Sequence, residues 1–396
     1  MAYVITGPGL TNIMTPMGQA YSDSVPMLVI SSCLDETAAT RGQLHQMKDQ
    51  RGAAACVCDW SEEARSAEAA YALIDRALAE FECARPRTKH LTLPIRLLEQ
   101  NAAPAPEGAI ALSREELNLA VCKQLTHELA DAERPLFILG GGCVADAGDT
   151  LNRVIEKSGA AVFTTYAGRG CVAADYPLSF GSMLARPGSA DVAAKADLVV
   201  AVGTELAEVD LWRAKLGHKA PMWRVDIDPE VVASPSGPDD MGLRCSSAAF
   251  FAAMDVSLKQ ALTSKWNPAE IAALKVAWRA EVDAERPGIV PVADALRECL
   301  PEGTMIYSDM TQFAYTAKEV WDMDRPGHWH HPTGFGTLGY ATPAAIGGAV
   351  ARKGLATMAI IGDYGFHYTM QELGVAVELG LPLPIILWDN GKLKEI

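Results

Sequence analysis

The chain has 396 residues, enough for two or three domains of ordinary size. Hydrophobic residues make up 49% and charged residues 21%, a mixture that is typical of a globular protein with a large core and excludes a small disulfide-rich module. The formal net charge of −15 argues against a nucleic acid or an anionic membrane surface as the main partner.

The nine cysteines are scattered and contain no CxxC pair. An odd number of cysteines without framework spacing predicts reduced thiols and a cytoplasmic location. The first residues hold no basic segment followed by an apolar run, so no signal peptide is expected. No uninterrupted apolar stretch has the length of a membrane span, so no membrane association is expected.

Short apolar runs alternate with helical stretches along the whole chain, which predicts an α/β fold with parallel sheets. In the first part, an amphipathic helix is expected over residues 66–83, and strands over 3–5, 27–31 and 90–93. The Pro- and Ala-rich segment 101–108 predicts a linker and a domain boundary.

The middle of the chain shows a doubly wound pattern. A helix capped by Ser113, with Glu116 completing a capping box, is expected to open it. The other elements expected here are strands at 136–139, 161–164, 198–202 and 222–227, and helices at 150–156, 248–262 and 268–285. Residues 234–240 predict a loop.

The last part of the chain again alternates short apolar runs with helical stretches. It predicts helices at 292–300 and 369–379, strands at 305–308, 357–361 and 384–388, and a Gly-rich stretch at 334–348. Both ends of the chain lie close to predicted strands, from which we expect the first and last domains to be incomplete.

The segment GDYGF carries the strongest chemical signal. Asp363 follows a predicted strand directly, and Asn390 follows the next strand along the chain. The carboxyl ends of parallel strands meet at one edge of a sheet, where ligands bind in open α/β folds. A carboxylate and an amide oxygen there suit Mg²⁺, although a helix cap and an unrelated turn asparagine are an equally good interpretation.

Three other glycine-rich turns are weaker signals. The first, Gly7–Asn12, follows a strand, and Asn12 could cap the next helix. The second, Gly334–Tyr340, could let the backbone approach a ligand or could serve tight helix packing. The third, Gly140–Ala145, fits a dinucleotide fingerprint without its acidic partner, and a structural turn is the better interpretation.

The histidines give no decisive signal. His328, His330 and His331 form a cluster that could bind zinc or transfer protons, or could lie near a substrate channel.

Taken together, GPGLTN, GDYGF through Asn390 and GFGTLGYATPAAIG resemble motifs of the thiamine-diphosphate enzymes, of the acetolactate synthase and 2-oxo-acid decarboxylase type. Asn390 follows Asp363 by 27 positions, which matches the spacing of that family's cofactor signature. The resemblance implies three domains: a pyrimidine-binding domain over 1–103, a central Rossmann-like domain over 112–265 and a diphosphate-binding domain over 286–396.

The resemblance also implies roles for individual residues. Asp363, Asn390 and the backbone carbonyl of Lys392 would be Mg²⁺ ligands. Leu338 would hold thiamine diphosphate in a bent conformation, and the Gly336 carbonyl would accept a hydrogen bond from its aminopyrimidine. The other residues expected near the cofactor are Gly362, Tyr364, Gly365, Thr311 and Gln312, with Asn12 and Gln46 from the first domain.

Two positions depart from the family signature: Tyr364 replaces a glycine, and Asp389 replaces the first of two asparagines. The family's proton-relay glutamate precedes the GPG turn, and no residue here matches it, so no catalytic residue is assigned. A catalytically incomplete fragment that at most binds the cofactor is therefore an alternative to an active enzyme.

The stretch SSCLDETAATRGQLHQMKDQ is most similar to the 5-guanidino-2-oxopentanoate decarboxylases of arginine catabolism. This resemblance implies decarboxylation of a small 2-oxo acid by a homodimer or homotetramer. Because that substrate is cationic, an acidic neighbour is expected, with Asp309 and Asp389 as candidates. An acetolactate synthase-type carboligase, which a bound flavin would favour, is the alternative enzyme.

Overall fold

The computed structural model describes residues 1–35, 41–106, 117, 119–234, 237 and 239–391. It divides into two compact units, which are treated separately below. The first comprises Met1–Arg114 with Pro332–Thr337, and the second comprises Glu115–His331 with Leu338–Ile396. The capping box expected at Ser113 and Glu116 and the expected metal ligand Lys392 lie outside the described residues.

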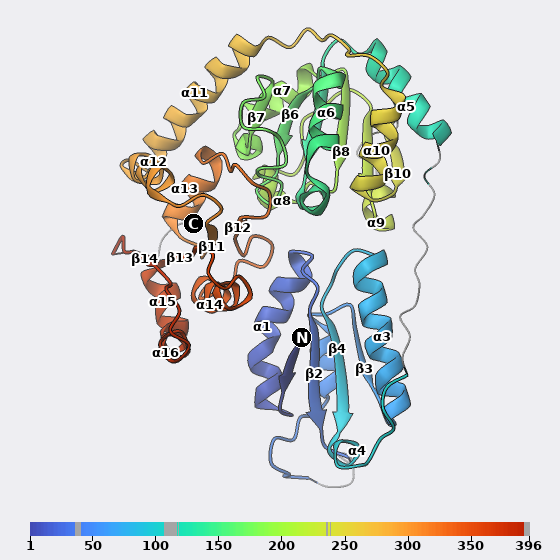
Figure 1. Ribbon diagram of the computed structural model, residues 1–396, viewed down its shortest axis with the longest axis vertical. Helices are drawn as coiled ribbons and strands as arrows, with labels where there is room; N and C mark the ends of the chain where they lie inside the picture. Colours follow the sequence, from blue (N-terminus) through green and yellow to red (C-terminus); the bar gives the residue numbers. More distant parts are fainter. Residues whose placement is uncertain (36–40, 107–116, 118, 235–236, 238, 392–396) are drawn as a thin grey trace. The chain divides into compact units, whose positions relative to one another are not determined.

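The first unit contains a four-stranded parallel sheet in the order β1-β2-β4-β3 (Figure 1). Its strands are β1 (Ala2–Val4), β2 (Leu28–Cys33), β3 (Trp60–Glu63) and β4 (Lys89–Pro94). Its helices are α1 (Pro8–Ser22), α2 (Gln50–Ala55), α3 (Ala67–Cys83) and α4 (Ile95–Leu98). Helix α3 begins where the sequence predicts, because the Ser66 hydroxyl accepts the Ala69 N–H and satisfies one free donor of its first turn.

Helix α1 begins earlier than expected. Its N-cap is Gly7, with φ of 68°, and Pro8 occupies the first helical position. Proline fits there because its fixed φ suits a helix and its missing N–H would have no partner in that turn. Asn12 therefore lies inside α1 with an exposed side chain, and the expectation that it caps the helix is wrong.

The second unit contains two parallel sheets. The larger has the order β10-β9-β8-β5-β6-β7. Its strands are β5 (Pro135–Leu139), β6 (Ala161–Thr164), β7 (Ser179–Gly181), β8 (Leu198–Val202), β9 (Met222–Asp226) and β10 (Met241–Arg244). Strands β5, β6 and β8 are buried along their whole length, which explains their continuous apolar runs.

Along the chain, helices alternate with the strands of this sheet (Figure 1). They are α5 (Leu119–Asp131), η1 (Gly141–Asp146), α6 (Asp149–Ser158), η2 (Met183–Ala185), α7 (Ser189–Lys195), α8 (Glu208–Leu211), α9 (Pro229–Val232), α10 (Ser247–Ser257) and α11 (Pro268–Glu285). Helix α10 ends at Ser257, before the expected residue 262, and the Leu262 N–H donates to the carbonyl of Lys157 near the end of α6.

The smaller sheet has the order β12-β11-β13-β14. Its strands are β11 (Met305–Ser308), β12 (Trp329–His330), β13 (Thr357–Gly362) and β14 (Ile385–Trp388). Its helices are α12 (Ile289–Cys299), α13 (Gln312–Val320), α14 (Ala341–Ala351), α15 (Asp363–Thr369), η3 (Met370–Glu372) and α16 (Leu373–Glu378). The chain becomes helical directly after β13, so the single helix expected over 369–379 is wrong in its start and in its continuity.

The three sheets confirm the expected α/β class, because every strand pairing among the described residues is parallel. No helix in the described ranges combines the length and apolarity that crossing a membrane requires.

Candidate active site

The carboxyl edge of the smaller sheet collects the residues with the strongest chemical signal. The register pairs Gly362 at the end of β13 with Trp388 at the end of β14. On the other side of β13, Ile360 pairs with Ser308 at the end of β11. Asp363, Asn390 and Asp309 all follow these strand ends within two residues, so they leave the sheet at the same edge.

Asp363 and Asn390, the two side chains expected to bind a metal, are both partly buried at this edge. Asp363 is the first residue of α15. The neighbouring Asp389 is exposed, and its Oδ1 accepts the Gly391 N–H at 2.8 Å. Gly391, with φ of 63°, turns the chain there. A carboxylate and an amide oxygen form a hard donor set, which suits a divalent cation that also binds phosphate oxygens.

Asp309 is completely buried and holds the glycine-rich turn. Its Oδ2 accepts the Gly339 N–H at 2.7 Å, and its Oδ1 accepts the Met310 N–H at 3.0 Å. Burial raises the pKa of Asp309 to about 6, partly offset by these bonds and by the Tyr340 amide. A Cβ on Gly365 would come within 2.1 Å of the carboxylate, so only glycine fits there.

Thr311 and Gln312 lie at the start of α13. The Thr311 hydroxyl caps the helix by accepting the Ala314 N–H at 3.0 Å. Its methyl group faces the end of β13, where a Cβ on Gly362 would come within 3.3 Å of it. The structure thus brings Thr311 and Gly362 together.

The turn around Gly336 and Leu338 is held at several points. Gly336 and Gly339 have φ of 68° and 81°, values that favour glycine. The Gly339 carbonyl accepts the Thr369 hydroxyl at 3.1 Å, which ties the turn to the end of α15. Leu338 remains 36% exposed although it is apolar, so its side chain is accessible at this turn.

Tyr364, the bulky replacement in the glycine-rich signature, is 46% exposed. Its neighbour Gly365 is buried against Asp309. The tyrosine side chain is therefore directed outwards from α15 rather than packed into the sheet.

The GPG turn of the first unit is anchored by a glutamine that sequence reasoning missed. Gln50 Oε1 accepts N–H of Gly7 at 3.2 Å, and its Nε2 donates to the carbonyl of Ser32 at 2.7 Å. The predicted residue, Gln46, instead accepts N–H groups of Gly42 and Gln43 within its own loop. Both glutamines occur in one polar stretch, and nothing in their spacing distinguishes them.

The three histidines of the cluster point to different partners. His328 Nδ1 lies 2.9 Å from the carbonyl of Pro326, and His330 stacks on Tyr307. His331 is partly buried, and its Nδ1 lies 2.9 Å from the Ser308 hydroxyl. Desolvation holds the pKa of His331 well below its usual range. Within the described ranges, no three His, Cys, Asp or Glu side chains are grouped so that they could hold a metal ion.

The glycines at 140–142 have a structural explanation. A Cβ on Gly140 would come within 2.1 Å of the Gly203 carbonyl, and one on Gly142 within 2.8 Å of Gly203 Cα. The loops that follow β5 and β8 can touch only because these residues lack side chains. This contact accounts for the pattern without a dinucleotide.

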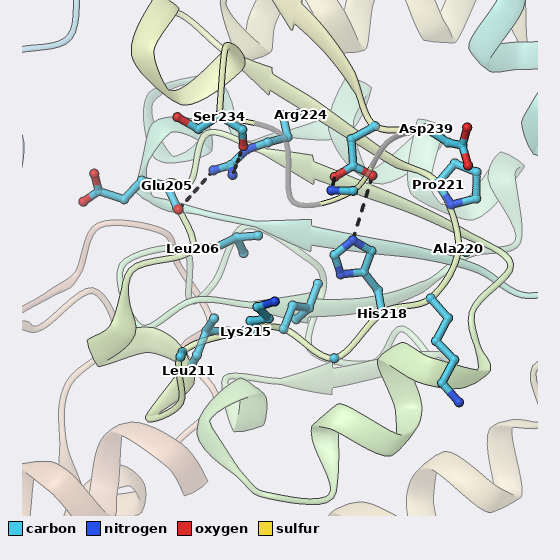
Figure 2. A pocket seen from close by; sticks show the side chains of 16 residues that line it. Glu205, Leu206, Leu211, Lys215, His218, Ala220, Pro221, Arg224, Ser234 and Asp239 are labelled. Carbon is cyan, nitrogen blue, oxygen red and sulfur yellow. Dashed lines mark hydrogen bonds and ion pairs between the residues drawn. The ribbon is translucent and has the colours of Figure 1, made fainter.

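A cavity of about 660 Å³ in the second unit is lined by residues within 205–240 (Figure 2). Arg224 of β9 lies beside it and donates to the backbone carbonyls of Ser234 and Glu205, at 3.1 and 3.0 Å. His218 Nε2 lies 3.9 Å from Asp240 Oδ1 on the same side. Basic and acidic side chains alternate around this cavity, so its lining does not favour one sign of ligand charge.

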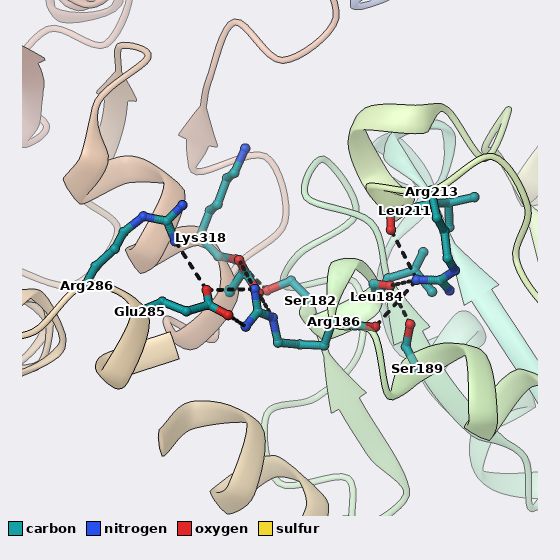
Figure 3. A network of polar contacts seen from close by, with 10 residues as sticks. Ser182, Leu184, Arg186, Ser189, Leu211, Arg213, Glu285, Arg286 and Lys318 are labelled. Carbon is teal, nitrogen blue, oxygen red and sulfur yellow. Dashed lines mark hydrogen bonds and ion pairs between the residues drawn. The ribbon is translucent and has the colours of Figure 1, made fainter. Parts of the chain in front are cut away.

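Helix α13 is fixed by a buried polar network (Figure 3). Arg186, which follows η2, pairs with Glu319 of α13 at 2.6 Å and with Glu285 of α11 at 2.8 Å. The Ser182 hydroxyl donates to the Lys318 carbonyl at 2.6 Å. These contacts connect the two sheets of the second unit and hold the helix that Thr311 caps.

Family models match three parts of the chain. Residues 1–53 match the N-terminal TPP binding domain of the thiamine pyrophosphate enzymes. Residues 122–254 match the central domain of these enzymes, and residues 309–396 match their C-terminal TPP binding domain.

Several named proteins are similar in sequence to this chain. A probable 2-ketoarginine decarboxylase, AruI, of Pseudomonas aeruginosa is 40% identical over all of this chain and 72% of its own length. Acetolactate synthase 1 of Zea mays is 27% identical over 99% of this chain and 63% of its own length. The large subunit of acetolactate synthase isozyme 2 of Escherichia coli is 27% identical over 99% of this chain and 71% of its own length. The chain belongs to the thiamine pyrophosphate enzyme family.

Proposed function

We propose that this chain takes part in the thiamine-diphosphate- and Mg²⁺-dependent decarboxylation of a 2-oxo acid. The observation that carries the proposal is the pairing of Gly362 with Trp388, because it brings the residues after β13 and β14 to one edge of the sheet. Asp363 and Asn390 would hold Mg²⁺ there, with the Lys392 backbone carbonyl as a third ligand.

The residues at this edge fit the cofactor chemically. The carboxylate and amide oxygens suit Mg²⁺ and leave coordination positions for the diphosphate. Leu338 offers an accessible apolar surface, and the buried Thr337 hydroxyl beside it has no hydrogen-bond partner among the described residues. When bound, thiamine diphosphate supplies a nucleophilic carbon and a cationic ring that takes up the electron pair left behind when CO₂ departs.

The chain's own residues would bind and orient the cofactor. The Gly336 carbonyl would accept a hydrogen bond from the aminopyrimidine, and Leu338 would keep the cofactor bent. Thr311, Gln312, Gly362, Tyr364 and Gly365 would lie near the diphosphate, while Asn12 and Gln46 would approach it from the first domain. We retain the domain limits 1–103, 112–265 and 286–396 as part of this proposal.

The favoured substrate is 5-guanidino-2-oxopentanoate, also called 2-ketoarginine. The 40% identity to a probable 2-ketoarginine decarboxylase supports this choice over an acetolactate synthase reaction, whose named relatives are 27% identical. Of the two acidic candidates for the guanidinium, Asp309 is buried and bonded to backbone amides. Asp389 is exposed, and we assign the guanidinium contact to it. A homodimer or homotetramer in the cytoplasm completes the proposal.

The test measures CO₂ release from 2-ketoarginine and from pyruvate, with thiamine diphosphate and Mg²⁺ added. Asp363→Asn should abolish Mg²⁺-dependent cofactor binding in a calorimetric titration, whereas Glu378→Gln, on the exposed end of α16, should not change it. Formation of acetolactate from pyruvate would favour the synthase. Cofactor binding without CO₂ release would indicate that the chain binds the cofactor but does not catalyse the reaction. An Asp363→Asn variant that binds the cofactor normally would overturn the metal assignment.

A further inference from the structure

The segment Pro332–Thr337 packs with the first unit, although the residues on either side of it belong to the second. It lies against the last turns of α1. The Gly334 N–H donates to Asp23 Oδ1 at 2.7 Å, and the Thr337 N–H donates to Gln19 Oε1 at 3.2 Å. Two backbone amides, three residues apart, are thus held by two side chains from one helix end.

These two side chains are bonded to each other. Gln19 is 5% exposed, and its Nε2 donates to Asp23 Oδ2. The Asp23 N–H donates in turn to the Gln19 carbonyl and ends the helix. The Gln19 amide group thus links the two acceptors to each other. The bond to the ionised Asp23 is of the stronger, charge-assisted kind.

The side chains of Ser22 and Asp23 leave little room for a Cβ at position 334. A Cβ on Gly334 would lie 2.8 Å from Ser22 Cβ and 2.9 Å from Asp23 Oδ1. The ring of Phe335 covers Gly18 one turn earlier, where an added Cβ would lie 2.8 Å from the ring. The end of α1 is therefore shaped for this segment by two glycines as well as by two acceptors.

We propose that Gln19 and Asp23 are positioning residues for the cofactor site, an inference that rests on the proposed function. The turn that they hold contains Gly336, and Leu338 is the next residue beyond it. On the far side of Leu338, the Gly339 amide is held by Asp309. The carbonyl and the apolar side chain assigned to thiamine diphosphate thus lie between two anchored amides, and loss of one anchor frees the turn.

The first measurement needs no cofactor. Amide hydrogen exchange of the segment 332–338 is followed in the intact chain for Asp23→Ala and Gln19→Leu, with Asp23→Asn as the variant that keeps an acceptor for the Gly334 N–H. We expect exchange to rise about tenfold for Asp23→Ala and Gln19→Leu, the effect of losing one hydrogen bond of ordinary strength, and much less for Asp23→Asn. Unchanged exchange in both Asp23→Ala and Gln19→Leu would overturn the contact.

The second measurement titrates thiamine diphosphate in the presence of Mg²⁺. The dissociation constant should rise about tenfold for Asp23→Ala and recover in Asp23→Asn, because an anchored turn lowers the ordering cost of binding. Faster exchange with unchanged affinity would overturn the positioning role. If the unaltered chain fails to bind the cofactor, the proposed function fails, while the exchange result still decides the contact between α1 and the segment.

Discussion

The amide of Gly339 donates a 2.7 Å hydrogen bond to Asp309, whose carboxylate is completely buried at the end of β11. The two residues lie 30 positions apart in the chain. One buried carboxylate therefore joins the end of a strand to a glycine-rich turn and to the first turn of α15, where Gly365 leaves room for it.

This burial predicts a pH dependence of stability. The pKa of Asp309 is raised to about 6, above its value in an unfolded chain, so the folded state binds more protons between the two values. The stabilisation from this group is complete at low pH and is lost as pH rises through about 6. Compared with Asp309→Asn, the native chain should lose on the order of 3 kcal/mol of unfolding free energy between pH 4 and pH 7.

Denaturant unfolding at several pH values measures this difference. Asp322→Asn, which alters a partly exposed carboxylate of the same unit, serves as the control. Parallel pH profiles for the native chain and Asp309→Asn would contradict the expected titration.

The glycines after β5 predict a large steric effect. Gly140→Ala would place a Cβ 2.1 Å from the Gly203 carbonyl, and the backbone there has to move. We expect a loss of about 1–3 kcal/mol of stability, the usual effect of overpacking. Gly347→Ala in the exposed face of α14 meets nothing within 4 Å and should stabilise the chain by about 0.5–1 kcal/mol.

Thermal unfolding of the two alanine variants tests this contrast. A Gly140→Ala variant as stable as the native chain would show that the two loops do not touch.

Much of the fold could be predicted because buried parallel strands carry continuous apolar runs. Residues 198–202 and 161–164 form β8 and β6 as expected. Strand β3 was missed because three of the four residues in its sequence, WSEE, are polar and it lies at the edge of its sheet, and β12 is only two residues long. Propensity and periodicity carry little information at such positions.

The candidate site could also be predicted only in part from the sequence. Asp363 and Asn390 could be placed at one sheet edge because each follows a strand closely. The contacts of Asp309 with Gly339 and of Gln50 with Gly7 could not, because they join segments 30 and 43 residues apart and depend on packing. Local sequence patterns contain no signal for such pairs.

The ion pair between Arg186 and Glu319 predicts an asymmetric mutational response. The side chains are 9% and 6% exposed, and burial raises the pKa of Glu319 against the opposing effect of Arg186. Arg186→Met would leave a buried carboxylate without its cation and should cost about 3–5 kcal/mol. The double variant with Glu319→Met removes that charge as well and should recover most of the loss.

A double-mutant cycle by denaturant unfolding measures the coupling. Glu285 is 46% exposed at its side chain, so Glu285→Gln should change stability much less. Additive losses in the cycle would contradict a direct interaction between Arg186 and Glu319.

Lys318 predicts a pH dependence of the opposite kind. Its ammonium group lies 4.1 Å from the centre of the Tyr166 ring and 4.7 Å from that of Tyr315, in a fully enclosed position. Burial lowers its pKa to about 7, and the nearby Arg169 acts in the same direction. The stabilisation from this group is complete at pH values above its unfolded pKa of about 10.4. It is lost as pH falls through the folded pKa of about 7.

Lys318→Met keeps the packing of the side chain and removes its titration. Its melting temperature should therefore exceed that of the native chain by an amount that grows as pH falls from 10 to 7, measured by calorimetry. Lys259→Met, at an exposed position, should show no such trend. If the native chain and Lys318→Met change in parallel over this range, the lysine retains its charge inside the fold, and the two tyrosine rings compensate for its lost hydration.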